Sequence, residues 1–135
     1  MKGIVPELLC TNLALTKSFY IDILGFEMKY ERPEETFAYL SLMGADLMFE
    51  QVDGPGRRWI TGDLQRPFGR GVNLQITVID VSALYARVLH RASERLYLPL
   101  EQKSYVCGSV VSVVRQFVVQ DPDGYLLRFS QTAAD

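Results

Sequence analysis

The chain has 135 residues, of which 48% are hydrophobic, and its 16 acidic and 14 basic side chains give a formal net charge of −2. A chain of this length buries roughly 70% of the surface that its unfolded form exposes, enough for one domain without metal or disulfide support. The near-neutral charge argues against a nucleic-acid partner held through its phosphates. No apolar run approaches the ~20 residues that span a bilayer, and Glu7 comes too early for a signal peptide, so we expect a soluble cytoplasmic protein.

The first half of the chain predicts a strand, a helix and then three strands. Segment 5–10 is rich in apolar residues and predicts a strand, after which Thr11 or Asn12 can cap a helix. The helix is expected to end at Gly25, which suits the left-handed residue just past a helix terminus. Its apolar residues at every fourth position are Leu15, Phe19 and Ile23. The three strands that follow are an extended stretch up to Tyr30 and a hairpin formed by 37–42 and 45–51.

The second half predicts the same order of elements after a connecting loop. Residues 52–71 hold five glycines, two prolines and four arginines, a composition typical of a loop. Residues 72–78 alternate between apolar and polar side chains, which predicts a strand, and Asp80 can cap an amphipathic helix. The apolar positions of that helix are Val81, Leu84, Tyr85, Val88 and Leu89. Further strands are expected over 96–103, 109–115, 116–120 and 125–131, the last two joined by a tight turn at 121–124.

The similarity of the two halves predicts an internal duplication. The hairpins match at an offset of 80 residues, and the first strand and helix cap match at an offset of 68, where Asn12 corresponds to Asp80. The identical pairs in the hairpins are Phe37 and Phe117, Gly44 and Gly124, Leu47 and Leu127, Phe49 and Phe129, and Gln51 and Gln131. We therefore predict an α+β fold in which one domain, 1–135, contains two βαβββ modules, 4–51 and 72–131, joined by loop 52–71.

Two such modules are expected to form a cup-shaped mixed sheet with the helices on its outer face. Residues two apart share one face of a strand, so Leu47, Phe49, Leu127 and Phe129 are expected to face the helices. The predicted wall of the cup is mixed polar and aromatic, which is typical of a pocket for a sizeable, partly planar ligand. It consists of Val5, Glu7, Leu9, Phe37, Tyr39, Ser41, Asp46, Met48, Glu50, Asn73, Gln75, Thr77, Leu126, Arg128 and Ser130. The alternative is that these residues form two solvated sheet faces.

The layout of these motifs resembles the glyoxalase/bleomycin resistance/dioxygenase (vicinal oxygen chelate) superfamily. The motifs are Asn12-Leu13, Ser18-Phe19-Tyr20, Leu24-Gly25-Phe26 and the hairpin that runs from Asp121-Pro122-Asp123-Gly124 to Phe129. The resemblance covers nearly the whole chain. It implies paired βαβββ modules around a cup, commonly in a homodimer, in which subunits sometimes exchange elements.

The resemblance also identifies the positions at which metal-using members carry His or Glu ligands. In this chain they hold Val5, Met48, Asn73 and Arg128, which do not form a normal ligand set because they offer a weak sulfur donor, one amide carbonyl and a repelling cation. The second hairpin, with Asp-Pro-Asp-Gly followed by Leu126-Leu127-Arg128, is most similar to the bleomycin resistance branch. That branch implies sequestration of a cationic, planar-ended antibiotic without chemistry.

We therefore predict a cytoplasmic homodimer that binds a small molecule, such as a bleomycin-like antibiotic, without a metal or other cofactor and without nucleic-acid or membrane partners. Carboxylates from Glu7, Asp46 and Glu50 are expected to attract a cationic ligand, and aromatic rings to stack on it. The predicted ligand-binding residues are Glu7, Phe37, Tyr39, Met48, Glu50, Trp59, Asn73, Gln75 and Arg128. Trp59 is also consistent with a solvated loop.

Two other functions remain open. One is an enzyme of the same superfamily, a lyase or oxidoreductase, that uses a displaced metal set or takes Glu7 or Glu50 as a general base. The other is a binding module for an ordinary metabolite. His90 is expected to interact with the end of the second helix, Cys10 to lie in the core, and the exposure of Cys107 stays undecided.

Overall fold

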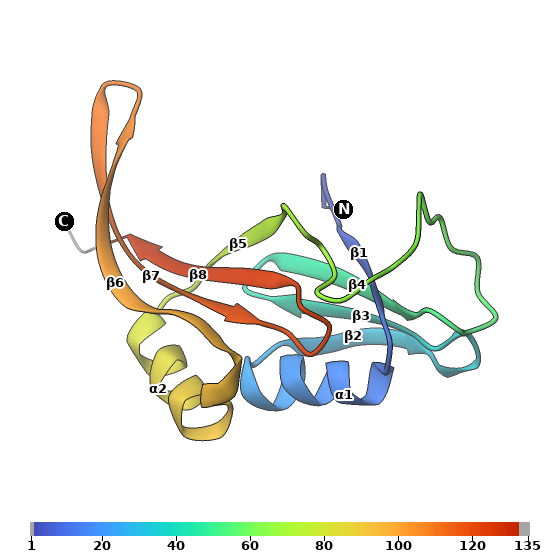
Figure 1. The fold of residues 1–135 in the computed structure, drawn as a ribbon. Helices are drawn as coiled ribbons and strands as arrows, with labels where there is room; N and C mark the ends of the chain where they lie inside the picture. Colours follow the sequence, from blue (N-terminus) through green and yellow to red (C-terminus); the bar gives the residue numbers. More distant parts are fainter. Residues whose placement is uncertain (1, 133–135) are drawn as a thin grey trace. The chain divides into compact units, whose positions relative to one another are not determined.

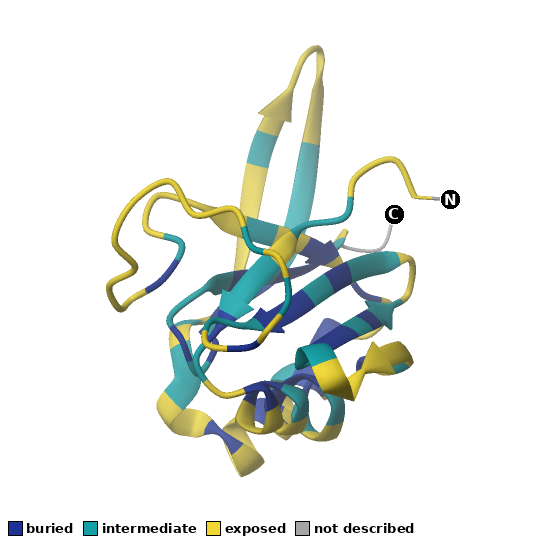
Figure 2. Cartoon of the chain, turned by 90° about the vertical axis from the view of Figure 1, so that its right-hand side faces the viewer, coloured by how far each residue is buried: buried dark blue, intermediate teal, exposed yellow. Residues whose placement is uncertain are grey.

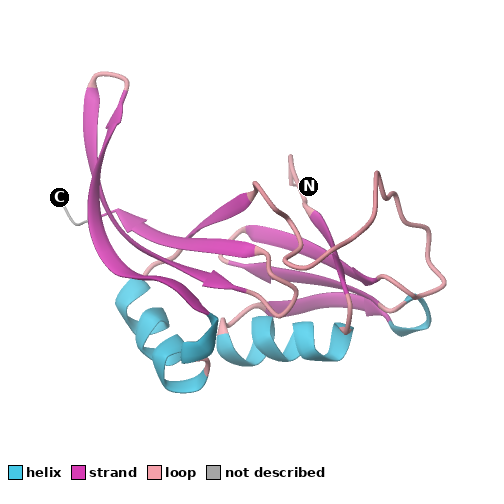
Figure 3. Ribbon diagram, viewed as in Figure 1, coloured by secondary structure: helices cyan, strands magenta, loops and turns pink. Residues whose placement is uncertain are grey.

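The computed structural model describes residues 2–132 and divides the chain into two compact units, Met1–Phe68 and Gly69–Asp135. Each unit contains one four-stranded mixed sheet and one main helical segment (Figure 1 and Figure 3). The predicted α+β fold of two βαβββ modules is therefore confirmed. Residues 53–72 contain neither a helix nor a strand.

The sheet of the first unit has the strand order β1-β4-β3-β2. Its strands are β1 (Glu7–Cys10), β2 (Glu27–Arg32), β3 (Phe37–Leu42) and β4 (Ala45–Gln51). Strand β1 pairs with β4 in parallel, while the other neighbours are antiparallel. The predicted hairpin turns at Met43 and Gly44, whose φ angles of 50° and 90° are both positive. Positive φ at both central residues matches the twist of the flanking strands.

The helical segment of the first unit differs from the regular helix predicted over 13–25. It begins as α1 (Leu13–Lys17) and continues as a π-helix (Ser18–Ile23), in which the amide of Leu24 donates to the carbonyl of Phe19 at 3.1 Å. Leu15 of the predicted apolar spacing precedes the π turn and is 58% exposed, because at 100° per residue it lies about 160° around α1 from buried Leu13 and about 100° from buried Thr16. The residues actually buried are Leu13, Thr16, Phe19, Tyr20 and Leu24. Gly25 follows with a φ of 89°, as predicted.

An aromatic cluster forms the core of the first unit. The ring of Tyr20 is fully buried and lies 4.6 Å from that of Phe49, 5.3 Å from Phe26 and 5.5 Å from Phe19. Edge-to-face and tilted contacts at these distances add to the free energy gained from burial. Phe49 is therefore on the helix-facing side of β4, as strand alternation predicts.

The sheet of the second unit repeats the same topology with the order β5-β8-β7-β6. Its elements are β5 (Asn73–Thr77), α2 (Val81–Arg91), a short 3-10 turn (Ser93–Arg95), β6 (Leu96–Cys107), β7 (Val110–Gln120) and β8 (Leu126–Thr132). The two strands predicted over 109–115 and 116–120 are one continuous strand, β7. This prediction was wrong because the valine-rich run has high strand propensity but no break that ends a strand.

Strands β6 and β7 form a hairpin that extends beyond the rest of the sheet (Figure 1). Pairing between β7 and β8 covers only Val114 to Gln120, whereas β6 and β7 stay paired with each other up to Cys107 and Val110. The end of the hairpin is largely exposed, in contrast to the buried residues where the sheet meets the helix (Figure 2). This hairpin contains the extra residues that the two sequence offsets imply.

Helix α2 buries one stripe of side chains against its sheet. Val81, Leu84 and Val88 are buried, but Leu89 of the predicted stripe is 44% exposed. At 100° per residue Leu89 lies about 80° from Val81, at the edge of the stripe, where the sheet does not cover it. Below the helix, the ring of Phe117 lies 5.5 Å from that of Phe129 and 5.2 Å from that of Tyr85.

The duplication extends to the hydrogen bonds at the two helix starts. Asn12, rather than Thr11, caps α1 by accepting from the amide of Leu15, and Asp80 caps α2 in the same way. The side chains of Gln51 and Gln131 accept from the first helical amides, those of Leu13 and Val81, at 2.8 and 2.9 Å. Residues that match in sequence therefore have the same structural role in both units.

The turn predicted at 121–124 is present and is held by one carboxylate. Oδ1 of Asp121 accepts hydrogen bonds from the amides of Asp123, Gly124 and Tyr125 at 2.8 to 3.0 Å.

None of the helices within residues 2–132 is long and apolar enough to span a membrane. The cup between modules, the homodimer and the cytoplasmic location stay predictions.

Candidate functional site

Five of the predicted site residues lie on one face of the first sheet. The strand register places Met48 between Glu7 and Tyr39, and it pairs Glu50 with Phe37. Since Leu47 and Phe49 are buried on the opposite face of β4, these five side chains share the face that α1 does not cover. We call this set, Glu7, Phe37, Tyr39, Met48 and Glu50, the unit-1 face.

The rings of the unit-1 face are not equally accessible. Phe37 is 1% exposed, and the guanidinium carbon of Arg32 lies 4.0 Å from the centre of its ring. Tyr30 on the edge strand β2 is 48% exposed and stacks on Tyr39, with ring centres 5.0 Å apart and planes 17° from parallel. Sequence reasoning missed Tyr30 because the strand that β2 pairs with could not be assigned from the sequence. The available signal was its spacing of two residues from Arg32, which places both side chains on one face of β2.

The carboxylate of Asp46 accepts hydrogen bonds from two neighbouring hydroxyl groups. Ser41 Oγ donates to it at 2.6 Å, and the phenol of Tyr39 donates to its other oxygen. The bonds from Ser41 and then Tyr39 lower the pKa of Asp46, while the bond to Asp46 raises the pKa of Tyr39 to about 12. Asp46 thus stays ionised at neutral pH, and the phenol of Tyr39 stays protonated.

The two glutamates of the unit-1 face differ in exposure. Glu50 is 4% exposed, and its carboxylate lies 3.4 Å from Nη1 of Arg58. Arg58 belongs to a loop that passes close to this carboxylate, since a Cβ on Gly56 of the same loop would lie 2.6 Å from it. Glu7 is exposed, yet partial burial of its carboxyl, and then repulsion from Glu50, raise its pKa against the opposing effect of Arg32. Glu7 is therefore the accessible carboxylate of this face.

Trp59 lies in the loop that follows Glu50, and the structure does not place it on the unit-1 face. Its side chain is 71% exposed, with the guanidinium carbon of Arg57 5.0 Å from its ring. A cation over an indole is a favourable surface contact. The ring is thus open to solvent on the surface of the first unit.

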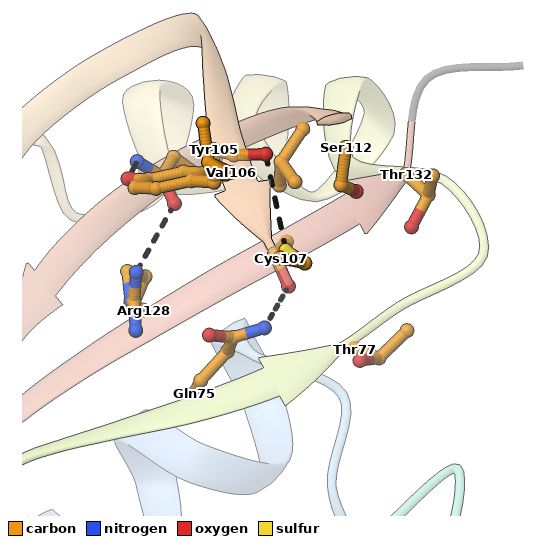
Figure 4. A pocket seen from close by; sticks show the side chains of 11 residues that line it. Gln75, Thr77, Tyr105, Val106, Cys107, Ser112, Arg128 and Thr132 are labelled. Carbon is orange, nitrogen blue, oxygen red and sulfur yellow. Dashed lines mark hydrogen bonds between the residues drawn. The ribbon is translucent and has the colours of Figure 1, made fainter. Parts of the chain in front are cut away.

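The second unit contains a cavity of about 470 Å³, formed by its sheet and the β6–β7 hairpin (Figure 4). Of the predicted site residues, Gln75 and Arg128 line it and are paired across β5 and β8, whereas Asn73 does not line it. The remaining lining residues are Thr77, Tyr105, Val106, Cys107, Ser112, Val114, Gln116, Ser130 and Thr132. We call this cavity the unit-2 pocket.

Sequence reasoning missed the hairpin side of the unit-2 pocket. Ser112, Val114 and Gln116 alternate along β7, and Tyr105 and Cys107 alternate along β6, so each set shares one face of its strand. The alternation of Ser112, Val114 and Gln116 can be recognised in the sequence only if 109–120 is treated as one strand. Cys107, whose exposure the sequence left undecided, is exposed, while Cys10 is buried as predicted.

A network of side-chain hydrogen bonds organises the floor of the unit-2 pocket. Gln116 is 3% exposed, and its Nε2 donates to the phenol oxygen of Tyr105 at 2.7 Å and to Glu101 at 2.9 Å. These two bonds use both amide hydrogens, so Oε1 of Gln116 is left facing Nη1 of Arg128 at 3.5 Å. Gln75 donates to Ser130 at 3.2 Å.

The four positions where metal-using relatives carry ligands do not fit a divalent ion. Val5 has no donor, and the half-buried Arg128 carries a positive charge. Met48 offers a soft sulfur and Asn73 a neutral carbonyl oxygen, donors that suit different metals. Within residues 2–132, no three His, Cys, Asp or Glu side chains are grouped as metal ligands.

Comparison with known proteins agrees with the fold. Residues 5–129 match the family model of the Glyoxalase/Bleomycin resistance protein/Dioxygenase superfamily. The chain belongs to this superfamily. No curated protein matches it.

Solved structures of the superfamily are similar over nearly the full chain. TioX from Micromonospora sp. ML1 is 21% identical with a TM-score of 0.74, over 97% of this chain and 98% of that one. A glyoxalase/bleomycin resistance protein/dioxygenase from Alicyclobacillus acidocaldarius is 20% identical with a TM-score of 0.67, over 99% and 93%. A superfamily member from Vibrio splendidus 12B01 is 46% identical over 93% and 94%, with a TM-score of 0.44. The first two share the fold.

Proposed function

We propose that this protein binds and sequesters a small, partly planar organic molecule without a metal, as expected for the bleomycin resistance branch of its superfamily. The observation that carries the proposal is the unit-2 pocket. Its volume of about 470 Å³ lies within the range of small-molecule sites, and its lining combines hydroxyl, amide and guanidinium groups with the apolar side chains of Val106 and Val114. The four metal-ligand positions lack a usable donor set, which favours binding without metal chemistry.

The unit-1 face supports a planar ligand with a positive group. The stacked pair of Tyr30 and Tyr39 offers a flat apolar surface, and Glu7 supplies an accessible carboxylate. Asp46 and Glu50, also expected to attract a cation, are already engaged by hydroxyls and by Arg58. Glu7 is therefore the carboxylate of this face that we expect to attract a cationic group.

Titration of the full, metal-stripped protein with bleomycin tests the antibiotic assignment. We expect a saturable calorimetric signal that EDTA does not change and that Glu7→Gln weakens, because this change removes the accessible carboxylate of the unit-1 face. Glu94→Gln is the matched control, since Glu94 is exposed in the second unit and lies outside the unit-1 face. No saturable signal at high micromolar bleomycin removes the antibiotic assignment.

A second function, metal-free proton abstraction, is favoured by one observation. The raised pKa of Glu7, caused by partial burial and by nearby Glu50, brings its carboxyl closer to the operating pH of a general base. Exchange of the methyl protons of pyruvate in deuterated water, followed by NMR, provides a test. Exchange that Glu7→Gln abolishes favours the enzyme, and equal exchange in wild type and variant rejects Glu7 as its base.

A further inference from the structure

We infer that the unit-2 pocket receives a carboxylate group of its ligand and that Arg128 is the side chain that pairs with it. The inference rests on the proposed ligand-binding function and adds the chemical class of the ligand, an organic monoanion with an apolar body. Such a ligand differs from the cationic group expected for the unit-1 face, so the two sites recognise different chemistry.

Arg128 is an incompletely satisfied cation in the interior of the sheet. It lies on β8, which has neighbours on both sides, and its Nε is buried without a hydrogen-bond partner among residues 2–132. Its guanidinium donates a long hydrogen bond of 3.5 Å from Nη1 to Oε1 of Gln116. A buried donor that stays unpaired costs free energy, and an oxyanion in the pocket recovers that cost.

The charge of Arg128 is also uncompensated. Among the described lining residues Arg128 alone carries a formal charge, and no ion pair within residues 2–132 includes it. The nearest acid in the network, Glu101, accepts from Gln116 rather than from Arg128. Lys103 and Glu101 share this face of β6 because they pair with Val114 and Gln116, so their opposite charges offset each other and leave that of Arg128 in excess.

The geometry around Arg128 favours a carboxylate over a larger or more highly charged anion. A guanidinium presents two parallel N–H groups that match the two oxygens of a carboxylate. The hydroxyl of Ser112 and the apolar side chain of Val106 line the pocket with Arg128 (Figure 4). Ser130 adds a second hydroxyl, and Val114 adds apolar surface for the rest of the ligand. One uncompensated arginine balances one negative charge, whereas a phosphate dianion leaves an excess.

Paired aromatic probes test the inference on the full-length protein. Benzoate and benzamide have the same size and ring but differ in charge, and titration followed by ¹⁵N–¹H NMR reports their affinity at the pocket. We expect benzoate to bind about tenfold more tightly than benzamide and to shift the Arg128 Nε–H resonance. Arg128→Gln should remove the preference, and Arg128→Lys should retain part of it because the charge remains without the fork.

Arg115→Gln is the matched control, because Arg115 carries the same charge on neighbouring β7 but donates to Ser82 of α2, on the helix side. This variant should keep the preference for benzoate. Equal affinity for benzoate and benzamide at the pocket overturns the inference and leaves the proposed function standing. Tighter binding of phenylphosphonate than of benzoate overturns the carboxylate class. If no probe shifts pocket resonances at millimolar concentration, the inference and the proposed function both fail.

Discussion

Thr16 carries a polar atom that the fold buries without a hydrogen bond. Its side chain is 1% exposed in α1, and its Oγ1 has no partner among residues 2–132. The backbone carbonyl one turn earlier, that of Asn12, accepts instead from the amide of Thr16. We predict that Thr16→Val stabilises the protein by about 1 kcal/mol, because the change removes an unsatisfied hydroxyl and keeps the shape. Urea unfolding measures the difference.

Thr16→Ser is the control for this prediction, since it keeps the hydroxyl and deletes the methyl group. It should destabilise the protein by about 1 kcal/mol through lost packing. A destabilised Thr16→Val variant means that the hydroxyl makes a favourable bond in solution, which contradicts the structural account of this position.

Glu7 should make stability depend on pH in the direction opposite to that of most carboxylates. Partial burial and Glu50 raise its pKa above the unfolded value, so the folded state binds more protons between the two values. Its contribution is therefore most favourable below the ordinary glutamate pKa and is lost as the pH rises through the raised one. Glu7→Gln mimics the protonated form, so its stability relative to wild type should increase from about pH 4 to neutral pH.

Denaturant unfolding of both proteins across that pH range tests the sign. Glu94→Gln, at an exposed position in the second unit, is the control and should follow the wild-type curve. A constant stability difference between Glu7→Gln and wild type at all pH values shows that the Glu7 pKa is the same in both states.

At the level of elements, each main helix depends on a glutamine from the last strand of its own module. Gln51 and Gln131 accept from the first helical amides, which otherwise have no partner within the helix. We predict that Gln51→Ala and Gln131→Ala each destabilise the protein by about 1 kcal/mol. Thermal or urea unfolding provides the measurement.

Gln102→Ala at an exposed strand position is the reference for these two variants and should change stability by less than about 0.5 kcal/mol. The duplication predicts similar losses for Gln51→Ala and Gln131→Ala, because the bonds have nearly the same length in both modules. Losses no larger than that of the reference contradict this role for the glutamines.

Sequence patterns predicted the elements whose signals are local. The alternation in 45–51 and the turn residues at 121–124 fix a strand and a turn whatever the tertiary contacts are, and the structure agrees with both. The π-helix over Ser18–Ile23 could not be predicted, because Leu15, Phe19 and Ile23 have the spacing of an ordinary helix. Burial of Tyr20 against Phe49 decides instead which side faces the sheet.

The sequence predicted the candidate site only where strand alternation determines which residues share a face. Alternation placed Glu7, Tyr39 and Met48 on one face, and Gln75 with Arg128 on another, since strand periodicity alone determines these sets. It could not show that Arg32 covers Phe37, which depends on the pairing of an edge strand. The wall formed by the β6–β7 hairpin depends on how far two strands continue together.

For the whole molecule, the two units share one topology but not one surface. Both sheets have the parallel first strand beside the last strand, and the parallel register pairs Glu7 with Met48 as it pairs Gln75 with Arg128. The second unit differs by its longer hairpin, and its pocket uses residues of that hairpin. The duplicated fold therefore presents a different surface in each unit.

Metal content tests the central claim, binding without a metal, most directly. Elemental analysis is made on the full protein after growth with added zinc, nickel, iron and manganese and after dialysis. Because Val5, Met48, Asn73 and Arg128 offer no adequate donor set, we predict far less than one equivalent of any of these metals per chain. One tightly held equivalent contradicts the account.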